Sequence, residues 1–186
     1  MTLVAIAASG ASVTHTFDLV IASDDLRAAW RAGMGTLEPS CQQEIFDWQL
    51  VDANGDGRQD VMYRVAYEDY MGLRILVAGA SSGYTAIDAV DGQGFQFSVE
   101  PGADGKPVVV VERNCCCVAE IYIYRLERVD GSDTLTELGG GQSESCETSG
   151  AFELMRDQSG RVRGFTETGK KKHRIWRLRK GALTEQ

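Results

Sequence analysis

The chain has 186 residues, of which 43% are hydrophobic, and its formal net charge is −8. This size and composition predict one domain with a substantial apolar core, and the sequence lacks the long Leu-rich run of a membrane-spanning helix. Residues 170–180 hold seven Lys or Arg, so the other 12 basic residues stand against 27 acids, a formal charge of −15. This acidic body argues against a nucleic acid as the main partner, because phosphate binding needs a broad basic face.

The N-terminal segment leaves the compartment open. Residues 3–8 are apolar, but the segment is short and no basic residue precedes it, so it does not resemble a signal peptide. Either the protein is cytoplasmic, or a native export signal has been replaced by Met1. Residues 13–21 alternate apolar and polar side chains, which predicts a strand with His15 on its buried face. Residues 23–32 open with Ser-Asp-Asp and predict one short helix.

Residues 52–60 carry the strongest local signal, with the sequence D-A-N-G-D-G-R-Q-D. Oxygen-bearing side chains recur at alternate positions, and Gly57 stands at the sixth position, where a loop around a cation must turn sharply. Ca²⁺ takes about six to eight oxygen ligands from carboxylates, amides and backbone carbonyls. Three carboxylates so close in sequence would otherwise repel one another. The predicted calcium ligands are the side chains of Asp52, Asn54, Asp56 and Asp60 and the backbone carbonyl of Arg58.

This loop differs from an EF-hand in its last position and in its flanks. The twelfth residue is Tyr63, where an EF-hand places a bidentate Glu. Alternating apolar residues on both sides predict two strands, so the whole segment from about residue 44 to residue 67 is expected to form a hairpin. Asp, Asn and Gly are also ordinary turn residues, so a turn without metal is the alternative.

A calcium loop between two strands resembles the FG-GAP and VCBS repeats of β-propeller proteins. The matching residues are 52–61, D-A-N-G-D-G-R-Q-D-V. The resemblance covers about one repeat, because no second loop of this kind appears in the sequence. It implies a propeller-like arrangement of strands held together by Ca²⁺.

The rest of the sequence predicts short strands separated by turn signals, among them Asp104-Gly105 and Asp130-Gly131. Residues 139–150 are rich in Gly and Ser and predict an exposed loop. A four-stranded propeller blade needs about 40–45 residues, and no sequence repeat of that length is evident. We therefore expect a single all-β domain over residues 1–186. It should be mostly antiparallel and resemble an incomplete or degenerate β-propeller, with a β-sandwich or barrel as the alternative.

Five cysteines are present, and their spacing is not that of a zinc site. They are Cys41, Cys115, Cys116, Cys117 and Cys146. The three consecutive ones would face alternate sides of a strand, so one can pair with Cys41 and another with Cys146. We expect at least one disulfide and leave the pairing open; five reduced, buried thiols are the alternative. A disulfide and a calcium loop that binds at about 10⁻⁴–10⁻³ M both favour a location outside the cytoplasm.

No catalytic constellation emerges, and we predict that the protein is not an enzyme. Residues 79–83 match G-x-S-x-G around Ser81, but a strand follows where that motif needs a helix, so a turn is expected. His173 lies in the basic segment from Lys170 to Lys180, with no acid close in sequence to orient it. This segment either binds an acidic partner or anionic lipid, or forms a charged edge strand that prevents aggregation.

These features predict a calcium-stabilised binding protein that is periplasmic or secreted. Small exported FG-GAP-like proteins resemble bacterial periplasmic inhibitors of peptidoglycan hydrolases, including lysozyme inhibitors and immunity proteins. The resemblance implies a basic, lysozyme-like partner that an acidic protein attracts by charge. One alternative is a calcium-dependent adhesion or carbohydrate-binding module that uses exposed aromatic residues: Tyr67, Tyr70 and Tyr84. Another is a small hydrolase with carboxylates that the sequence does not single out.

Overall fold

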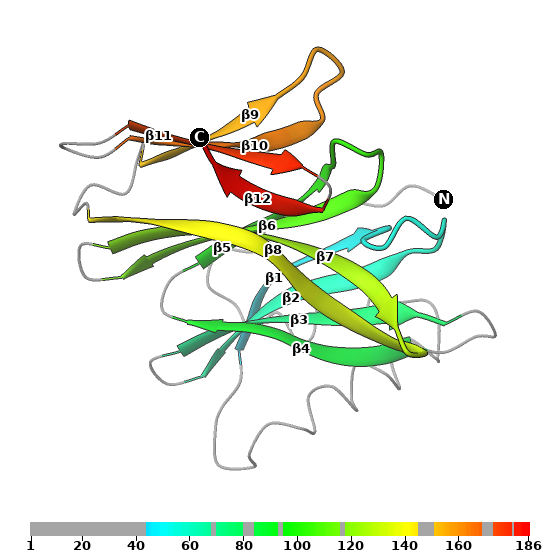
Figure 1. The fold of residues 1–186 in the computed structure, drawn as a ribbon. Helices are drawn as coiled ribbons and strands as arrows, with labels where there is room; N and C mark the ends of the chain where they lie inside the picture. Colours follow the sequence, from blue (N-terminus) through cyan, green and yellow to red (C-terminus); the bar gives the residue numbers. More distant parts are fainter. Residues whose placement is uncertain are drawn as a thin grey trace. The chain divides into compact units, whose positions relative to one another are not determined.

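In a computed structural model, the described residues form twelve β-strands in three four-stranded antiparallel sheets (Figure 1). The structure describes residues 44–67, 70–79, 84–92, 95–115, 118–144, 151–168, 173–179 and 181–186. Within these ranges there is no helix, and hence none with the length and apolar character needed to cross a membrane. The predicted all-β, antiparallel class is confirmed.

The first sheet contains the predicted hairpin. Its strands pair in chain order as β1 (Glu44–Val51), β2 (Asp60–Tyr67), β3 (Tyr70–Ala78) and β4 (Tyr84–Gly92). The sequence predicted a strand buried on one face only, and β2 differs from that expectation. Met62 is as completely buried as its neighbours Val61 and Tyr63, which point to the other face. Both faces of β2 are therefore covered, and alternation of residue type underestimated the burial.

The second sheet is built on the two predicted Asp-Gly turns. Its strands pair in chain order as β5 (Phe95–Pro101), β6 (Pro107–Cys115), β7 (Val118–Val129) and β8 (Ser132–Glu144). Strands β5 and β6 reverse around Asp104 and Gly105, as expected. Strands β7 and β8 reverse at Asp130 and Gly131, whose φ angles of 50° and 84° suit a two-residue hairpin turn.

Of the three consecutive cysteines, the structure describes Cys115. The sequence predicted a long strand over residues 116–126. In the structure Cys115 is the last residue of β6 and pairs with Val118, the first residue of β7. The chain therefore reverses direction after Cys115, and the predicted long strand is present as β7, which begins two residues later than expected. Cys116 and Cys117 lie outside the described residues.

The prediction for the glycine-rich segment is also wrong in part. Residues 139–144 belong to β8 and pair with β7, where the sequence predicted an exposed loop. A side chain at Gly140 would overlap the ring of Tyr122, and a Cβ at Gly141 would lie 2.9 Å from Cε2 of Phe165. The glycines therefore make room for aromatic rings packed against the strand.

The third sheet is ordered β12-β11-β10-β9, with strands β9 (Phe152–Arg156), β10 (Val162–Thr168), β11 (His173–Arg179) and β12 (Ala182–Glu185). The sequence did not predict β12. Because β12 pairs with one side of β11 and β10 with the other, the basic strand lies inside the sheet. The prediction of a charged edge strand is therefore wrong.

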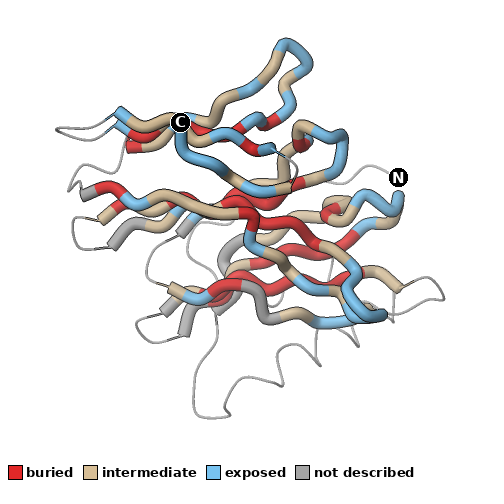
Figure 2. The backbone as a smooth tube through the Cα atoms, in the orientation of Figure 1, coloured by how far each residue is buried: buried red, intermediate tan, exposed pale blue. Residues whose placement is uncertain are grey.

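The chain divides into two compact units, Met1–Val51 with Arg58–Asp91, and Asp52–Gly57 with Gly92–Gln186. Within the second unit, the second and third sheets share an apolar core, visible as buried segments in Figure 2. Its buried members are Val108, Val110, Ile121, Ile123, Leu138, Val162, Phe165 and Leu178. An ion pair of 2.7 Å between Arg156 and Glu100 also links these two sheets.

Several predictions concern residues outside the described ranges. They are the strand over residues 13–21 with His15, the helix over residues 23–32, the turn at Ser81, and the disulfides, since Cys41, Cys116, Cys117 and Cys146 all lie outside.

Candidate functional site

The predicted calcium loop connects β1 to β2. Val51 and Asp60 form the last pair of the two strands, so the intervening residues make up the hairpin loop. Gly55 and Gly57 have φ angles of 80° and 85°, in the left-handed region that glycine adopts at little cost. Gly57 therefore makes the sharp turn that the sequence predicted for the sixth position.

Asp52 organises the backbone of the loop. Its Oδ1 accepts hydrogen bonds from the N–H groups of Gly55 at 2.7 Å and Asp56 at 3.0 Å. Its Oδ2 accepts a hydrogen bond from the N–H of Gly57 at 2.9 Å. Three backbone N–H groups therefore point at one carboxylate, and the loop folds around Asp52, its first residue.

Asn54 and Asp56 bring further oxygen atoms to the same place. The N–H of Asp56 donates to Oδ1 of Asn54 at 3.0 Å as well as to Oδ1 of Asp52, so two predicted ligand oxygens meet at one amide. The side-chain amide of Asn54 donates to Oδ2 of Asp56 at 3.0 Å. Asp56 itself is exposed, and Asn54 is partly exposed. The structure thus brings together three of the four predicted side-chain ligands.

The last two predicted ligands hold the end of the loop. Asp60 is completely buried, and its Oδ1 accepts a hydrogen bond from the N–H of Ala78 at 2.8 Å. The Nε of Arg58 donates to the backbone carbonyl of Ala78 at 3.2 Å. Among the described residues, no group of three or more His, Cys, Asp or Glu side chains is gathered as a metal site. The argument for Ca²⁺ is the chemistry of the ligands: Asp52, Asn54 and Asp56 supply hard oxygen donors, which Ca²⁺ prefers.

Each of the other two sheets also carries an Asp in the turn between its first two strands. Asp104, in the β5–β6 turn, accepts a hydrogen bond of 3.0 Å from Nη2 of Arg125, and its other carboxylate oxygen lies 3.0 Å from Nη1 in an ion pair. Asp157, between β9 and β10, accepts from the hydroxyl of Ser159 at 2.6 Å and from Nε of Arg163 at 2.9 Å. Hydrogen bonds from Ser159, the N–H of Arg161 and Arg163 hold the pKa of Asp157 well below its usual range.

In two of the three turns, therefore, an arginine neutralises the carboxylate. No such ion pair involves Asp52 within the described part of the chain, where backbone N–H groups are its partners. The sequence did not show this relation, because the three turns share only an Asp and a Gly. It follows from the strand order, which places each Asp between the first two strands of its sheet.

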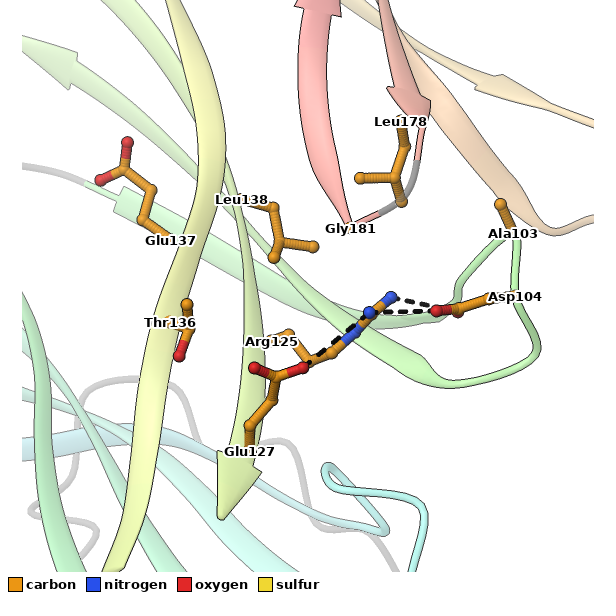
Figure 3. A pocket seen from close by; sticks show the side chains of 9 residues that line it. All are labelled: Ala103, Asp104, Arg125, Glu127, Thr136, Glu137, Leu138, Leu178 and Gly181. Carbon is orange, nitrogen blue, oxygen red and sulfur yellow. Dashed lines mark hydrogen bonds and ion pairs between the residues drawn. The ribbon is translucent and has the colours of Figure 1, made fainter. Parts of the chain in front are cut away.

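A pocket of about 450 Å³ lies between the second and third sheets (Figure 3). Arg125 reaches from β7 across this pocket to Asp104, and only 7% of its side chain is exposed, against 47% for Asp104. Glu127 lies 4.0 Å from the same guanidinium and is 38% exposed. Leu138 and Leu178 form the apolar wall. With three carboxylate residues, Glu137 included, and one guanidinium, the lining of the pocket has a net negative charge that suits a cationic group.

Removal of Asp104 should destabilise the protein. Asp104→Ala leaves the buried guanidinium of Arg125 without its bidentate partner, which costs about 2 kcal/mol. For a chain of this size, this corresponds to a melting temperature lower by about 4–8 °C. Thermal unfolding followed by circular dichroism measures it. In the double variant Asp104→Ala/Arg125→Met, no buried charge is left unpaired, and part of the loss should be recovered. An unchanged melting temperature in Asp104→Ala would contradict the assigned ion pair.

The other candidate residues form no site. His173 is exposed at the start of β11. Tyr84 is partly buried at the start of β4, whereas the side chains of Tyr67 and Tyr70 lie outside the described part, although their backbones pair at the end of β2 and the start of β3.

The chain is thus a member of the all-β class, with antiparallel sheets and an oxygen-rich hairpin loop. No protein-family model matches its sequence, and comparisons with curated proteins and with solved structures find no significant match.

Proposed function

We propose that residues 52–60 bind a structural Ca²⁺ ion. The observation that carries this proposal is the carboxylate of Asp52, which accepts three backbone N–H groups in a loop that turns at Gly57. In the related turns a guanidinium balances the carboxylate of Asp104 or Asp157, and a divalent cation would have the same effect here. Asp52, Asn54, Asp56, Asp60 and the carbonyl of Arg58 would hold the ion.

We propose further that the three sheets correspond to blades of an incomplete β-propeller. Each is a meander of four antiparallel strands, paired in chain order, which is the repeating unit of propellers. Each also opens with a turn that contains an Asp. A β-sandwich remains the alternative for the second and third sheets, which pack on one apolar core.

On this scaffold we propose a binding function outside the cytoplasm: inhibition of a peptidoglycan hydrolase of the lysozyme type. The formal charge of −8 favours encounter with a basic enzyme. The pocket around Arg125 adds a specific feature, because Asp104 and Glu127 present partly exposed carboxylates beside an apolar wall. A Lys or Arg side chain of the hydrolase matches this chemistry. The calcium ion would keep the scaffold rigid.

The test is lysis of a peptidoglycan suspension by purified hydrolases of the lysozyme type, with the protein added in millimolar calcium or after chelation. We expect inhibition in calcium that weakens with chelator, because the scaffold loses its structural ion, and with rising salt, because salt screens the attraction between the two proteins. Glu127→Gln should weaken inhibition about twofold to fivefold, the range for a partly exposed ion pair.

Glu185→Gln is the matched control, since Glu185 is exposed on β12 and the substitution changes the charge equally. It should inhibit like the unmodified protein. If no hydrolase of this type is inhibited in calcium, the proposed function is wrong. If inhibition occurs but survives chelation unchanged, the role given to the calcium ion is wrong.

A further inference from the structure

The basic strand β11 is not an edge strand, so its charges do not serve to prevent a sheet edge from pairing with another chain. It lies between β10 and β12 and pairs with both, so its backbone groups are not open to another chain. Arg177 and Arg179 are nevertheless exposed, and they follow each other at alternate positions of the strand. Two like charges on the same face of one strand repel each other, so a ligand of opposite charge would be favoured here.

A pocket of about 310 Å³ opens on this sheet. It is lined by Met155, Arg163, Arg177, Leu178 and Arg179. Arg163 donates to Asp157, with 2.9 Å between Nη2 and a carboxylate oxygen. No carboxylate within the described residues forms an ion pair with Arg177 or Arg179. The pocket therefore holds two guanidinium groups whose hydrogen-bond donors are available to a ligand.

The backbone of the sheet is irregular beside this pocket. Gly164 pairs with Met155 on one side and with Arg177 on the other, so one row across three strands has no side chain at its centre. The register shift between Val162 and Gly164 places Arg163 in a bulge, a feature that redirects a side chain. A larger residue does not fit at Gly164, because its Cβ would overlap the carbonyl of Trp176.

The chemistry of this pocket defines its ligand. Guanidinium groups bind carboxylates through paired hydrogen bonds. Arg177 and Arg179 are two residues apart on one strand, so they repeat at about 6.6 Å. Carboxylates at alternate positions of an extended peptide repeat at the same distance. Met155 supplies an apolar contact for the aliphatic part of a Glu side chain.

We propose that this pocket binds an acidic peptide segment of a partner protein, with Glu residues at alternate positions. The site lies on the third sheet, does not involve the calcium loop, and shares with the acidic pocket only the apolar residue Leu178 and none of its charged residues. It is therefore independent of the inhibitory function proposed above, and it gives the protein a second binding surface of opposite charge.

The test is fluorescence polarisation with a labelled peptide of four Ala-Glu repeats. We expect saturable binding to the full chain, no binding of the matched Ala-Gln peptide, and weaker binding at higher salt. The double variant Arg177→Gln/Arg179→Gln should bind about fivefold to tenfold more weakly, as expected for two exposed ion pairs.

Arg128→Gln is the control, because Arg128 is exposed in the second sheet and the change removes one positive charge from another place. It should bind the peptide like the unmodified protein, and all variants should melt at similar temperatures. Equal binding by the double variant would overturn the proposal. So would saturable binding of polyphosphate at the same arginines without binding of the acidic peptide, because the ligand would then be a phosphate polymer.

Discussion

Replacing Asp56 by alanine should abolish the part of the protein's stability that depends on calcium. Asp56 is exposed, so its removal leaves no cavity, and the proposed ion loses one carboxylate ligand. At a calcium concentration one hundred times the dissociation constant, binding adds about 2.7 kcal/mol to the free energy of unfolding. For a chain of this size, that corresponds to about 5–10 °C in melting temperature. The measurement is thermal unfolding in millimolar calcium and in chelator.

Asp157→Ala provides the matched control. Asp157 organises a comparable turn, but its carboxylate pairs with the guanidinium of Arg163. Its removal should lower the melting temperature by the same amount in calcium and in chelator. If the unmodified protein melts at one temperature under both conditions, the loop holds no stabilising calcium ion. In that case the hydrogen bonds between Asp52 and the backbone are sufficient to form a turn without metal.

Local sequence signals were enough to predict most of the strands. Alternating side chains located β1 and β2, and the Asp-Gly pairs located two hairpin turns, because both features act within a few residues. The glycine-rich part of β8 was mistaken for a loop. The reason for these glycines lies in Tyr122 and Phe165, which are distant in sequence, and no local rule contains that information.

The sequence likewise indicated only the candidate site whose residues are close together in the chain. The contacts among Asp52, Asn54 and Asp56 span at most four residues, so spacing alone indicated them. The ion pair between Asp104 and Arg125 spans 21 residues and depends on which strands are neighbours. The pocket on the third sheet is lined by residues of β9, β10 and β11 and depends on which strands are neighbours. Sequence spacing therefore predicts sites within one turn and misses those assembled by sheet register.

Phe165→Ala should produce the largest loss of stability among these substitutions. Phe165 is completely buried in the core shared by the second and third sheets. Its ring meets Phe152 edge-on at 5.7 Å and stacks on Trp176 at 5.8 Å, measured between ring centroids. Truncation removes these contacts and leaves a cavity, at a cost of about 3–5 kcal/mol. Urea unfolding measures the change, and Val129→Ala is the control, because Val129 is 47% exposed.

The shape of the urea unfolding transition also shows whether the second and third sheets unfold together. If the shared core makes the two sheets one cooperative unit, Phe165→Ala shifts a single transition to lower urea without changing its slope. If the third sheet instead unfolds on its own in the variant, the slope falls and a second transition appears. Val129→Ala should change the free energy of unfolding by less than about 0.5 kcal/mol, as expected for a surface position. A loss below about 1 kcal/mol in Phe165→Ala would contradict the close packing of its ring, because deletion of a completely buried aromatic ring cannot be that mild unless the two sheets separate in solution.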